Sequence, residues 1–464
     1  MKKNRIIALV SVVIFILIAI KIISYSAIFD NSDNEAENIK AWKHKIQTVE
    51  GSFFDANGEE IFAPTEPLLS DTTHLPVAFS YILGYNNHVY GASGLRSYYS
   101  SHLYKDMGTK KGGSIQLTID KKLQELAYDM LKDNNLSGSV IVLNAKNSEI
   151  MVMAGRQKID YDINLLNTVK YSETDSNGKP EYQKTWEKYL STPEFFIDPS
   201  TMDKKAPGSI YKIVTSAAAV LNGLEEYTYE DTGVIEVDRK PIRNAAGGVY
   251  GLETLQTALA HSTNTYFASL SLELGRYAMN DIADRFLVGE DIDIDFTTLR
   301  SDVSFDSGNH NRAMIGFGQG ALAITPLHIA MIGQSIVNDG VMYKPTIVKS
   351  TMGPLGNTET QNAKHEIIAQ PLKPDVAKKV KELLIGVTEY EDSKRGEGNE
   401  WRKKYTENIY CKTGTAEAKD NTNIYNSYYL CMTDDYVILI TVKDTTAYGS
   451  NFKPWAEEFL KILY

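Results

Sequence analysis

The sequence has very little cysteine: among its 464 residues only Cys411 and Cys431 carry a thiol. Two cysteines cannot form the disulfide framework of a small secreted domain, and no set of cysteines and histidines has the spacing of a zinc site. The phosphate-binding loop G-x-x-x-x-G-K-[ST], the metalloprotease motif H-E-x-x-H and the EF-hand calcium loop are also absent. These absences argue against a disulfide scaffold, a P-loop enzyme and the commonest metal-dependent sites.

The sequence also lacks a block of positive charge. Its formal net charge is −11, and its lysines and arginines are scattered along the chain. Binding to nucleic acid requires a basic surface, so we expect no nucleic-acid partner. Hydrophobic residues make up 43% of the chain and charged residues 23%, which is typical of a globular protein and not of a disordered or polytopic membrane protein. The length allows about three domains, or two unequal ones.

One long apolar run is present, over residues 6–29, interrupted near its outer end by Lys21. A helix rises about 1.5 Å per residue and needs about 20 residues to cross the hydrocarbon layer. Basic residues precede the run and acidic residues follow it, which places the N-terminus inside. We therefore predict a cytoplasmic tail (1–5), a transmembrane anchor (6–29) and an extracytoplasmic remainder. The alternative is a signal peptide cleaved near Ser24–Ser26.

The rest of the chain divides into three parts. Residues 30–48 are polar and acidic, as in a juxtamembrane linker. Asn57-Gly58 between two short apolar runs predicts a β-hairpin over residues 52–62. The sequence that follows has no long periodic element, so we assign 49–113 to a small non-catalytic module. Residues 114–464 form the main domain.

Predicted helices separate groups of predicted strands in the main domain. This order predicts an α+β fold with a mainly antiparallel sheet flanked by helices. The expected strands cover residues 114–120, 139–143, 149–153, 410–413, 428–432 and 436–443, and the expected helices cover 121–134, 209–221, 252–274 and 454–462.

Ser209 and Lys212 form an S-x-x-K pattern where a helix is predicted to begin. Residues three apart share one helix face, so Lys212 can reach the Ser209 hydroxyl. A serine is a poor nucleophile until a base removes its proton, and a lysine can do this where burial or a nearby cation favours its neutral form. The pattern also occurs at 176–179 and 450–453, but neither of these opens a long apolar helix.

Ser262-Thr263-Asn264 forms a second pattern, S-x-N. A second hydroxyl can relay a proton, and an amide side chain can donate and accept hydrogen bonds toward a peptide group. A helix cap or turn explains the same residues equally well when this pattern is taken alone.

Lys412-Thr413-Gly414-Thr415 forms the third pattern, at the end of a predicted strand. Glycine in a strand often marks the close approach of a ligand. A lysine and two hydroxyls beside it suit a carboxylate, and a backbone N–H can stabilise an oxyanion there. A solvated strand end is an equally good reading of this motif alone.

The order S-x-x-K, S-x-N, K-T-G is the motif set of penicillin-binding proteins and class A β-lactamases. Residues 114–464 resemble the transpeptidase domain of a class B penicillin-binding protein, a peptidoglycan D,D-transpeptidase. The hairpin over residues 137–154, the segments Gly318-Gln319-Gly320 and Thr325-Pro326-Leu327, and the extended Lys-Thr-Gly-Thr-Ala sequence are also similar to the family.

The upstream module resembles the family less closely. Residues 51–58 are similar to the family's Gly-Ser-Ile-x-Asp-Arg-Asn-Gly segment, but Ala56 replaces the usual arginine. Arg96 stands where a glutamate is common in Gly-Leu-Glu. The module is small, which suggests a short member of the class.

The resemblance implies acyl transfer from the D-Ala-D-Ala end of a stem peptide to Ser209, with Lys212 as the base. Ser262, coupled to Lys412, would pass the proton to the leaving amine. No metal or cofactor is required. The implied partners are stem peptides, β-lactam antibiotics, the membrane and a membrane glycosyltransferase.

Substrate binding is implied for four further residues. Asn264 would hold the substrate amide, and Thr413 and Thr415, separated by Gly414, would bind the terminal carboxylate. The N–H groups of Ser209 and Thr415 would hold the oxyanion.

Three alternatives remain open: a D,D-carboxypeptidase, a β-lactamase, and a non-catalytic β-lactam sensor or scaffold. The Glu-x-x-Leu-Asn sequence of class A β-lactamases does not occur between Thr265 and Cys411. We expect His261 and His328 to be structural. Cys411 and Cys431 lie symmetrically about residue 421, so a cross-strand disulfide is conceivable, but we favour two buried thiols.

Overall fold

The computed structural model describes residues 43–71, 73–87, 90–158, 160–166, 178, 181–292, 294–295, 298–361, 365–394, 396, 405–406, 408–418 and 423–464. The predicted anchor at 6–29 lies outside this range. Among the described residues, none of the helices combines the length and the apolar character that a bilayer crossing requires.

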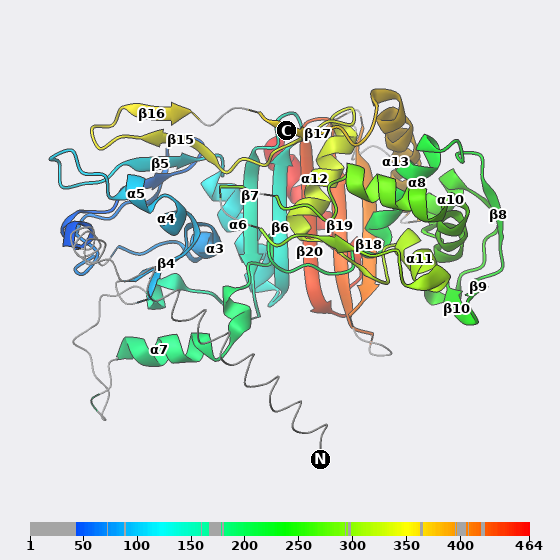
Figure 1. Ribbon diagram of the computed structural model, residues 1–464, viewed down its shortest axis with the longest axis horizontal. Coiled ribbons are helices and arrows are strands. Elements are labelled where there is room, and N and C mark those ends of the chain that lie inside the picture. The colour runs from blue at the N-terminus through cyan, green and yellow to red at the C-terminus, as the bar shows by residue number, and fades with distance from the viewer. Residues whose placement is uncertain are drawn as a thin grey trace, which may run out of the picture.

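A five-stranded antiparallel sheet forms the centre of the main domain (Figure 1). Two of its inner strands contain continuous apolar runs, over residues 140–143 and 437–440, because both of their faces are covered. The predicted α+β fold with a mainly antiparallel sheet is confirmed. In spatial order the strands are β18 (Tyr410–Glu417), β19 (Tyr425–Met432), β20 (Tyr436–Thr445), β6 (Ser137–Asn144) and β7 (Ile150–Arg156).

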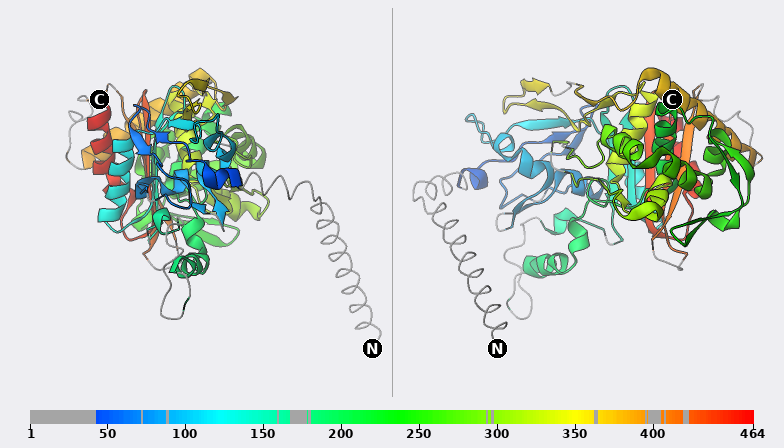
Figure 2. Two further views of the ribbon diagram at one scale, coloured as in Figure 1. Left: turned by 90° about the vertical axis from the view of Figure 1, so that its left-hand side faces the viewer. Right: turned by 45° about the vertical axis from the view of Figure 1, so that its right-hand side comes forward.

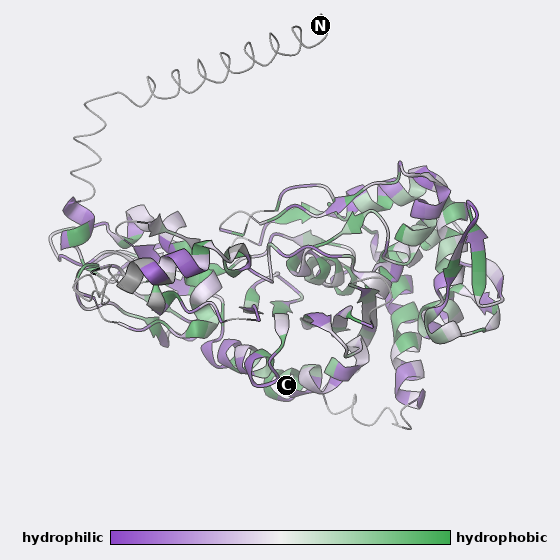
Figure 3. Ribbon diagram, turned by 90° about the horizontal axis from the view of Figure 1, so that it is seen from below, coloured by the Kyte–Doolittle hydropathy of each residue, from purple (hydrophilic) through white to green (hydrophobic). Residues whose placement is uncertain are grey.

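Helices cover both faces of this sheet (Figure 2). Helices α6 (Lys121–Asp133) and α15 (Lys453–Leu463) pack on one face, and α12 (Pro326–Val337) packs on the other. Every residue of α12 is buried. Figure 3 shows green, hydrophobic segments in the helices that cover the sheet. The Thr325 side chain caps α12, which explains the Thr-Pro-Leu segment.

The S-x-x-K helix and its neighbours lie beside the edge strand β18. They are α8 (Lys212–Leu221), α9 (Leu255–His261), α10 (Asn264–Arg285) and α13 (Pro374–Lys394). Helix α13 packs along β18 and also contacts α8, α9 and α12. The three sequence motifs therefore meet beside one edge of the sheet.

A second five-stranded sheet lies at the left of Figure 1. The β1–β2 hairpin turns at Asn57-Gly58 as predicted. Strands β15 and β16 come from the middle of the main-domain sequence, so this sheet joins strands from both sides of the boundary predicted after residue 113. Its strands are β16 (Thr358–Gln361), β15 (Val348–Met352), β5 (Ser114–Leu117), β1 (Phe53–Phe54) and β2 (Glu60–Phe62).

Arg96, which departs from the family pattern, has a buried charge partner. Its Nη2 and Nε donate to the Glu50 carboxylate at 2.6 and 2.8 Å. Asn86 and Tyr104 donate to the same carboxylate. Burial alone would raise the pKa of Glu50, but the charge and hydrogen bonds of Arg96 outweigh it, and the pKa is lowered. Arg96 therefore helps to hold the small module together.

Candidate active site

Ser209 lies in a short 3-10 turn, η4 (Gly208–Tyr211), that runs directly into α8. We call η4 the serine turn. Gly208 has a positive φ of 56°, and its N–H donates to the carbonyl of Gly318 at 2.9 Å. A Cβ atom on Gly318 would lie 1.8 Å from the carbonyl oxygen of Gly208, so only glycine fits there. The Gly-Gln-Gly segment thus packs directly against the serine turn and supports it through Gly318.

Ser262 lies at the break between α9 and α10. The sequence predicts one helix over 252–274, and this is wrong because Ser262 adopts a left-handed backbone conformation with φ 60° and ψ 42°. Non-glycine residues adopt this conformation at an energetic cost, and such strain concentrates at functional sites. Asn264 then begins α10. The break points the side chains of Ser262 and Asn264 toward Lys212.

Lys212 makes three hydrogen bonds from Nζ. It donates to the backbone oxygen of Ser262 at 2.5 Å, to the Ser262 hydroxyl at 3.1 Å and to Oδ1 of Asn264 at 2.8 Å. The side chain is fully buried. Burial first, and the charge of Lys412 second, lower the pKa of Lys212 well below its usual value. The three donated hydrogen bonds use all three N–H groups of the ammonium form. Burial and the charge of Lys412 favour its loss of one proton to give the neutral amine.

The expected contact between Lys212 and Ser209 is not formed. In the part of the chain that the structure describes, no hydrogen bond joins the Ser209 hydroxyl to Lys212, whose three donor directions are taken up by the S-x-N motif. The two residues are still close along the chain, because Ser209 lies in the serine turn and Lys212 is the first residue of α8. A base in such a site often aligns with its nucleophile only when substrate is bound.

Lys412, like Lys212, donates a hydrogen bond to the Ser262 hydroxyl. Its Nζ donates to Oγ of Ser262 and to the carbonyl of Thr413, both at 3.1 Å. Burial lowers the pKa of Lys412 to about 8, while Glu391 raises it and Lys394 lowers it further. The Ser262 hydroxyl is thus bracketed by two buried lysines.

The free edge of β18 presents N–H groups to the serine turn. In an antiparallel ladder these groups alternate between the partner strand and the open side. The N–H of Cys411 donates to the Thr388 hydroxyl on α13, away from β19. The alternation therefore directs the N–H groups of Thr413 and Thr415 to the open edge, and a Cβ on Gly208 would lie 3.3 Å from the nitrogen of Thr415. This arrangement suits an oxyanion site.

Gly414 marks the closest approach of β18 to the serine turn. A Cβ atom there would lie 2.8 Å from the carbonyl oxygen of Pro207 and 2.9 Å from Cγ1 of Ile210. The Thr415 hydroxyl accepts a hydrogen bond from the N–H of Gly449 at 3.3 Å, which ties it to η6 (Gly449–Phe452). All eight residues selected from the sequence therefore meet around the serine turn and the edge of β18.

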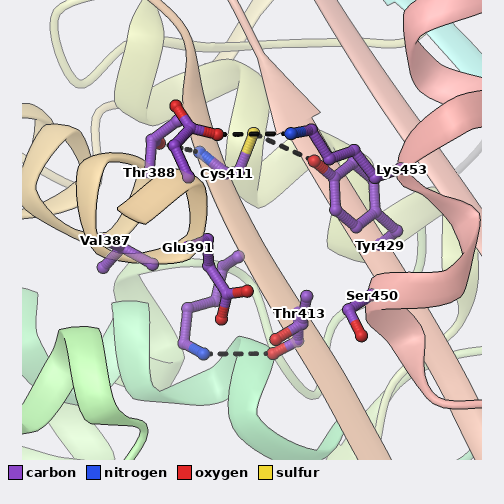
Figure 4. Close-up of a pocket in the computed structure, with 10 residues that line it drawn as sticks. Val387, Thr388, Glu391, Cys411, Thr413, Tyr429, Ser450 and Lys453 are labelled. Atoms are coloured by element: carbon purple, nitrogen blue, oxygen red, sulfur yellow. Dashed lines mark hydrogen bonds and ion pairs between the residues drawn. The ribbon is translucent and has the colours of Figure 1, made fainter. Parts of the chain in front are cut away.

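A small pocket lies behind Lys412, between α13, β18 and α15 (Figure 4). Ser450 and Lys453, which form one of the other S-x-x-K patterns, line this pocket. Lys453 is buried and paired with Asp392 at 3.2 Å, so its role there is structural. Cys411 also lines the pocket, and Cys431 stands directly opposite it on β19, with both thiols free and buried.

The two histidines near the motifs have structural partners, as predicted. Nδ1 of His261 lies 2.7 Å from the Glu253 carboxylate. His328 is buried between the Ser301 hydroxyl and the carbonyl of Phe286, and burial lowers its pKa to about 4. Over the described residues, no cluster of three or more histidines, cysteines or acids could hold a metal ion.

Several residues of this site were missed by sequence reasoning. Glu391 and Lys394 act on Lys412 from α13, and Asp231 and Asn244 anchor the residue that follows Asn264. They carry no motif and lie far from the lysines and the asparagine in sequence. The Gly-Gln-Gly resemblance was the one available signal for Gly318.

Known proteins of similar sequence also carry a transpeptidase domain or are named penicillin-binding proteins or transpeptidases. The family model described as the penicillin binding protein transpeptidase domain matches residues 138–461. Peptidoglycan D,D-transpeptidase PbpA of Mycolicibacterium smegmatis is 27% identical over 325 residues, which cover 66% of this chain and 61% of that protein. Penicillin-binding protein 3 of Bacillus subtilis is 25% identical over 382 residues, covering 78% of this chain and 51% of that protein. The chain thus spans 61% or less of the length of these two curated relatives.

Solved structures show the same fold. The crystal structure of PBPA from Mycobacterium tuberculosis matches with a TM-score of 0.77 at 19% identity, covering 90% of this chain and 99% of that chain. An imipenem acyl-enzyme complex of that protein matches with a TM-score of 0.77 at 18% identity and the same coverage. Because the family model covers more than half of the chain and the three motifs meet in one site, the chain belongs to the penicillin-binding protein transpeptidase family, as a class B member.

Proposed function

We propose that the chain is a serine D,D-transpeptidase that cross-links peptidoglycan stem peptides through an acyl-enzyme on Ser209, and that β-lactams acylate the same residue. The observation that carries the proposal is the placement of the Ser262 hydroxyl between Lys212 and Lys412, beside the serine turn. The family match and the PbpA relatives, which are named peptidoglycan D,D-transpeptidases, support the same reaction class.

Acylation begins at Ser209. The neutral amine of Lys212 removes the hydroxyl proton as Oγ attacks the carbonyl carbon of the penultimate D-alanine. Burial and the charge of Lys412 lower the pKa of Lys212, which increases the fraction of the neutral amine. The peptide C–N bond then breaks, and the proton passes from Lys212 through the Ser262 hydroxyl to the nitrogen of the departing D-alanine. The 3.1 Å contact between Lys212 and Ser262 suits this relay.

The edge of β18 binds the substrate. The charge of Lys412 and the hydroxyls of Thr413 and Thr415 attract the terminal carboxylate of the stem peptide. The N–H groups of Ser209 and Thr415 stabilise the oxyanion of the tetrahedral intermediate. Gly414 leaves space for the strand to approach the serine turn.

Asn264 holds the amide of the acyl donor, and a second stem peptide completes the reaction. The amine of this acceptor attacks the acyl carbonyl carbon, its proton returns through the lysine relay, and the Ser209 hydroxyl is released. The product is a cross-link. Hydrolysis by water instead of the amine would make the enzyme a carboxypeptidase.

The proposed location is the outer face of the cell membrane, with residues 6–29 as the anchor. The apolar run and the charges around it support this assignment. A glycosyltransferase in the same membrane would supply the glycan strands. Deletion of residues 1–29 should release the protein from the membrane fraction, and retention there would contradict the anchor.

A transpeptidation assay tests the reaction. The protein is incubated with a peptide ending in D-Ala-D-Ala and an excess of a D-amino acid, and products are separated by mass. We expect the terminal D-alanine to be exchanged for the added amino acid, and we expect Ser209→Ala to abolish this product. Hydrolysis without exchange would favour the carboxypeptidase. No product and no β-lactam adduct from folded protein would favour a non-catalytic binder.

A further inference from the structure

A buried carboxylate, Asp231, lies beside the S-x-N motif and has no part in the chemistry described above. It ends strand β8 (Thr228–Asp231) and is 1% exposed. The Thr265 hydroxyl donates to it at 2.6 Å, and the N–H groups of Gly233 and Tyr250 donate at 2.9 and 2.8 Å. The Asn244 amide donates to both carboxylate oxygens, at 3.0 and 2.9 Å. One carboxylate thus holds three separate chain segments.

Asn244 extends this network to the start of α10. Its Oδ1 accepts a hydrogen bond from the backbone N–H of Thr265 at 3.1 Å. The first N–H groups of a helix have no acceptor within the helix, so this contact fixes the entry of α10. Asp231 holds the Thr265 hydroxyl while Asn244 holds its N–H. Thr265 directly follows Asn264, so the network anchors the backbone of the substrate-binding residue.

The side chain of Asn264 is oriented by Arg243, the residue before Asn244. Its Nδ2 donates to the carbonyl of Arg243 at 3.0 Å, and its Oδ1 accepts from Lys212 at 2.8 Å. Arg243 ends strand β10 (Lys240–Arg243). An amide nitrogen has two hydrogens, so one of them is left for a carbonyl group of the substrate. The orientation of the Asn264 amide therefore depends on the position of residues 243–244.

We propose that Asp231 is a positioning residue that, through Asn244 and Thr265, fixes the Asn264 amide for recognition of the amide group on the acyl donor. This inference rests on the proposed function, since it concerns how that site recognises its donor. Loss of the carboxylate leaves the buried Thr265 hydroxyl and Asn244 amide without their acceptor. Residues 243–244 then move, and Asn264 loses its fixed orientation toward the substrate.

The charge state of Asp231 supports this role. Burial alone would raise the pKa of Asp231, but the hydrogen bonds from Thr265, Gly233, Tyr250 and Asn244 outweigh burial, and the pKa is lowered. The carboxylate is therefore ionised at neutral pH. Hydrogen bonds to an ionised acceptor are stronger than those between neutral groups, which keeps the network rigid.

The test compares two β-lactams that differ in one feature. Benzylpenicillin carries an acylamide side chain, whereas 6-aminopenicillanic acid has a free amine in its place. The variants are Asp231→Asn and Thr265→Val, which keep the shape of each side chain, and Thr265→Ser, which keeps the hydroxyl. Acylation rate constants are measured on the full chain for both compounds, together with the melting temperature of each variant.

We expect Thr265→Val and Asp231→Asn to slow acylation by benzylpenicillin about tenfold relative to 6-aminopenicillanic acid, the effect of one misplaced hydrogen bond. Thr265→Ser should restore the rate ratio of the unmodified protein. An equal loss for both compounds, or no loss, would overturn the positioning role. If Asp231→Asn does not fold, Thr265→Val decides the matter. Failure of the unmodified protein to react with either compound would instead overturn the proposed function, and this inference with it.

Discussion

Lys212 and Lys412 point their side-chain nitrogens at one hydroxyl: each Nζ lies 3.1 Å from Oγ of Ser262. Both side chains are buried, and two like charges in one site disfavour each other's charged form. The charge of Lys412 accordingly contributes, after burial, to the lowered pKa of Lys212. The site therefore couples the protonation of its candidate base to the charge of Lys412, the residue proposed to attract the substrate carboxylate.

The first prediction concerns the acid limb of the pH profile. Acylation requires neutral Lys212, so its rate rises with pH as Lys212 loses its proton. Because the charge of Lys412 lowers the pKa of Lys212, Lys412→Met should raise that pKa and move the acid limb to higher pH. The measurement is the second-order rate constant for acylation by a fluorescent penicillin from about pH 5 to pH 10. Lys379→Met, at an exposed position, is the control, and an unmoved limb in Lys412→Met would contradict the coupling.

The second prediction concerns the alkaline limb. The pKa of Lys412 is about 8, so acylation should fall above this pH as the lysine loses the charge that attracts the carboxylate. Glu391 raises this pKa, so Glu391→Gln should move the limb to lower pH. Lys394 lowers it, so Lys394→Gln should move the limb to higher pH. Shifts in the same direction for both variants would refute the assignment of this limb to Lys412.

The third prediction concerns the buried pair in the small module. Glu50→Gln leaves the Arg96 guanidinium without its charge partner and should destabilise the protein by about 3–5 kcal/mol in urea unfolding. The reversed pair, Glu50→Arg with Arg96→Glu, should recover part of this loss because both charges are again matched. Glu225→Gln, which breaks the exposed pair with Lys379, should have a much smaller effect because solvent screens that pair. Equal effects of the buried and exposed substitutions would show that Glu50–Arg96 is not a structural anchor.

The fourth prediction concerns Gly318. Gly318→Ala places a methyl group 1.8 Å from the carbonyl oxygen of Gly208, so the serine turn must shift and acylation should slow by about tenfold or more. Gly356→Ala is a matched control, because Gly356 has a similar positive φ (82°, against 88° for Gly318) but nothing within 4 Å of its Cβ position. It should cost about 1 kcal/mol of stability and leave acylation unchanged. Normal acylation by Gly318→Ala would mean that the Gly-Gln-Gly segment does not support the nucleophile.

The features that could be predicted from sequence are those with local signals. The three motifs stand out by spacing, and the hairpin symmetry about residue 421 correctly places Cys411 opposite Cys431, because an antiparallel hairpin pairs residues at equal distances from its turn. The central sheet followed from strands with clear apolar patterns. Thr325 and Pro326 are ordinary signals for the start of a helix.

The features that could not be predicted depend on contacts between distant segments. The left-handed conformation of Ser262 ends α9 and divides the predicted helix. Its one local signal was the helix cap or turn that also explained the S-x-N pattern. The pairing of β15 with β5 joins strands that are far apart in sequence, so it leaves no local pattern. Glu391 raises the pKa of Lys412, and Asp231 accepts a hydrogen bond from Thr265, the residue after Asn264. Their roles appear only when the fold brings them together.

Mass spectrometry of the protein after incubation with benzylpenicillin tests the central claim most directly. The account predicts a long-lived adduct of one drug mass, mapped by peptide sequencing to Ser209. Ser209→Ala should carry no adduct while remaining folded, and Ser176→Ala, which alters the S-x-x-K pattern at 176–179, should be labelled in full. Labelling of Ser209→Ala to the same extent as the unmodified protein would contradict the account.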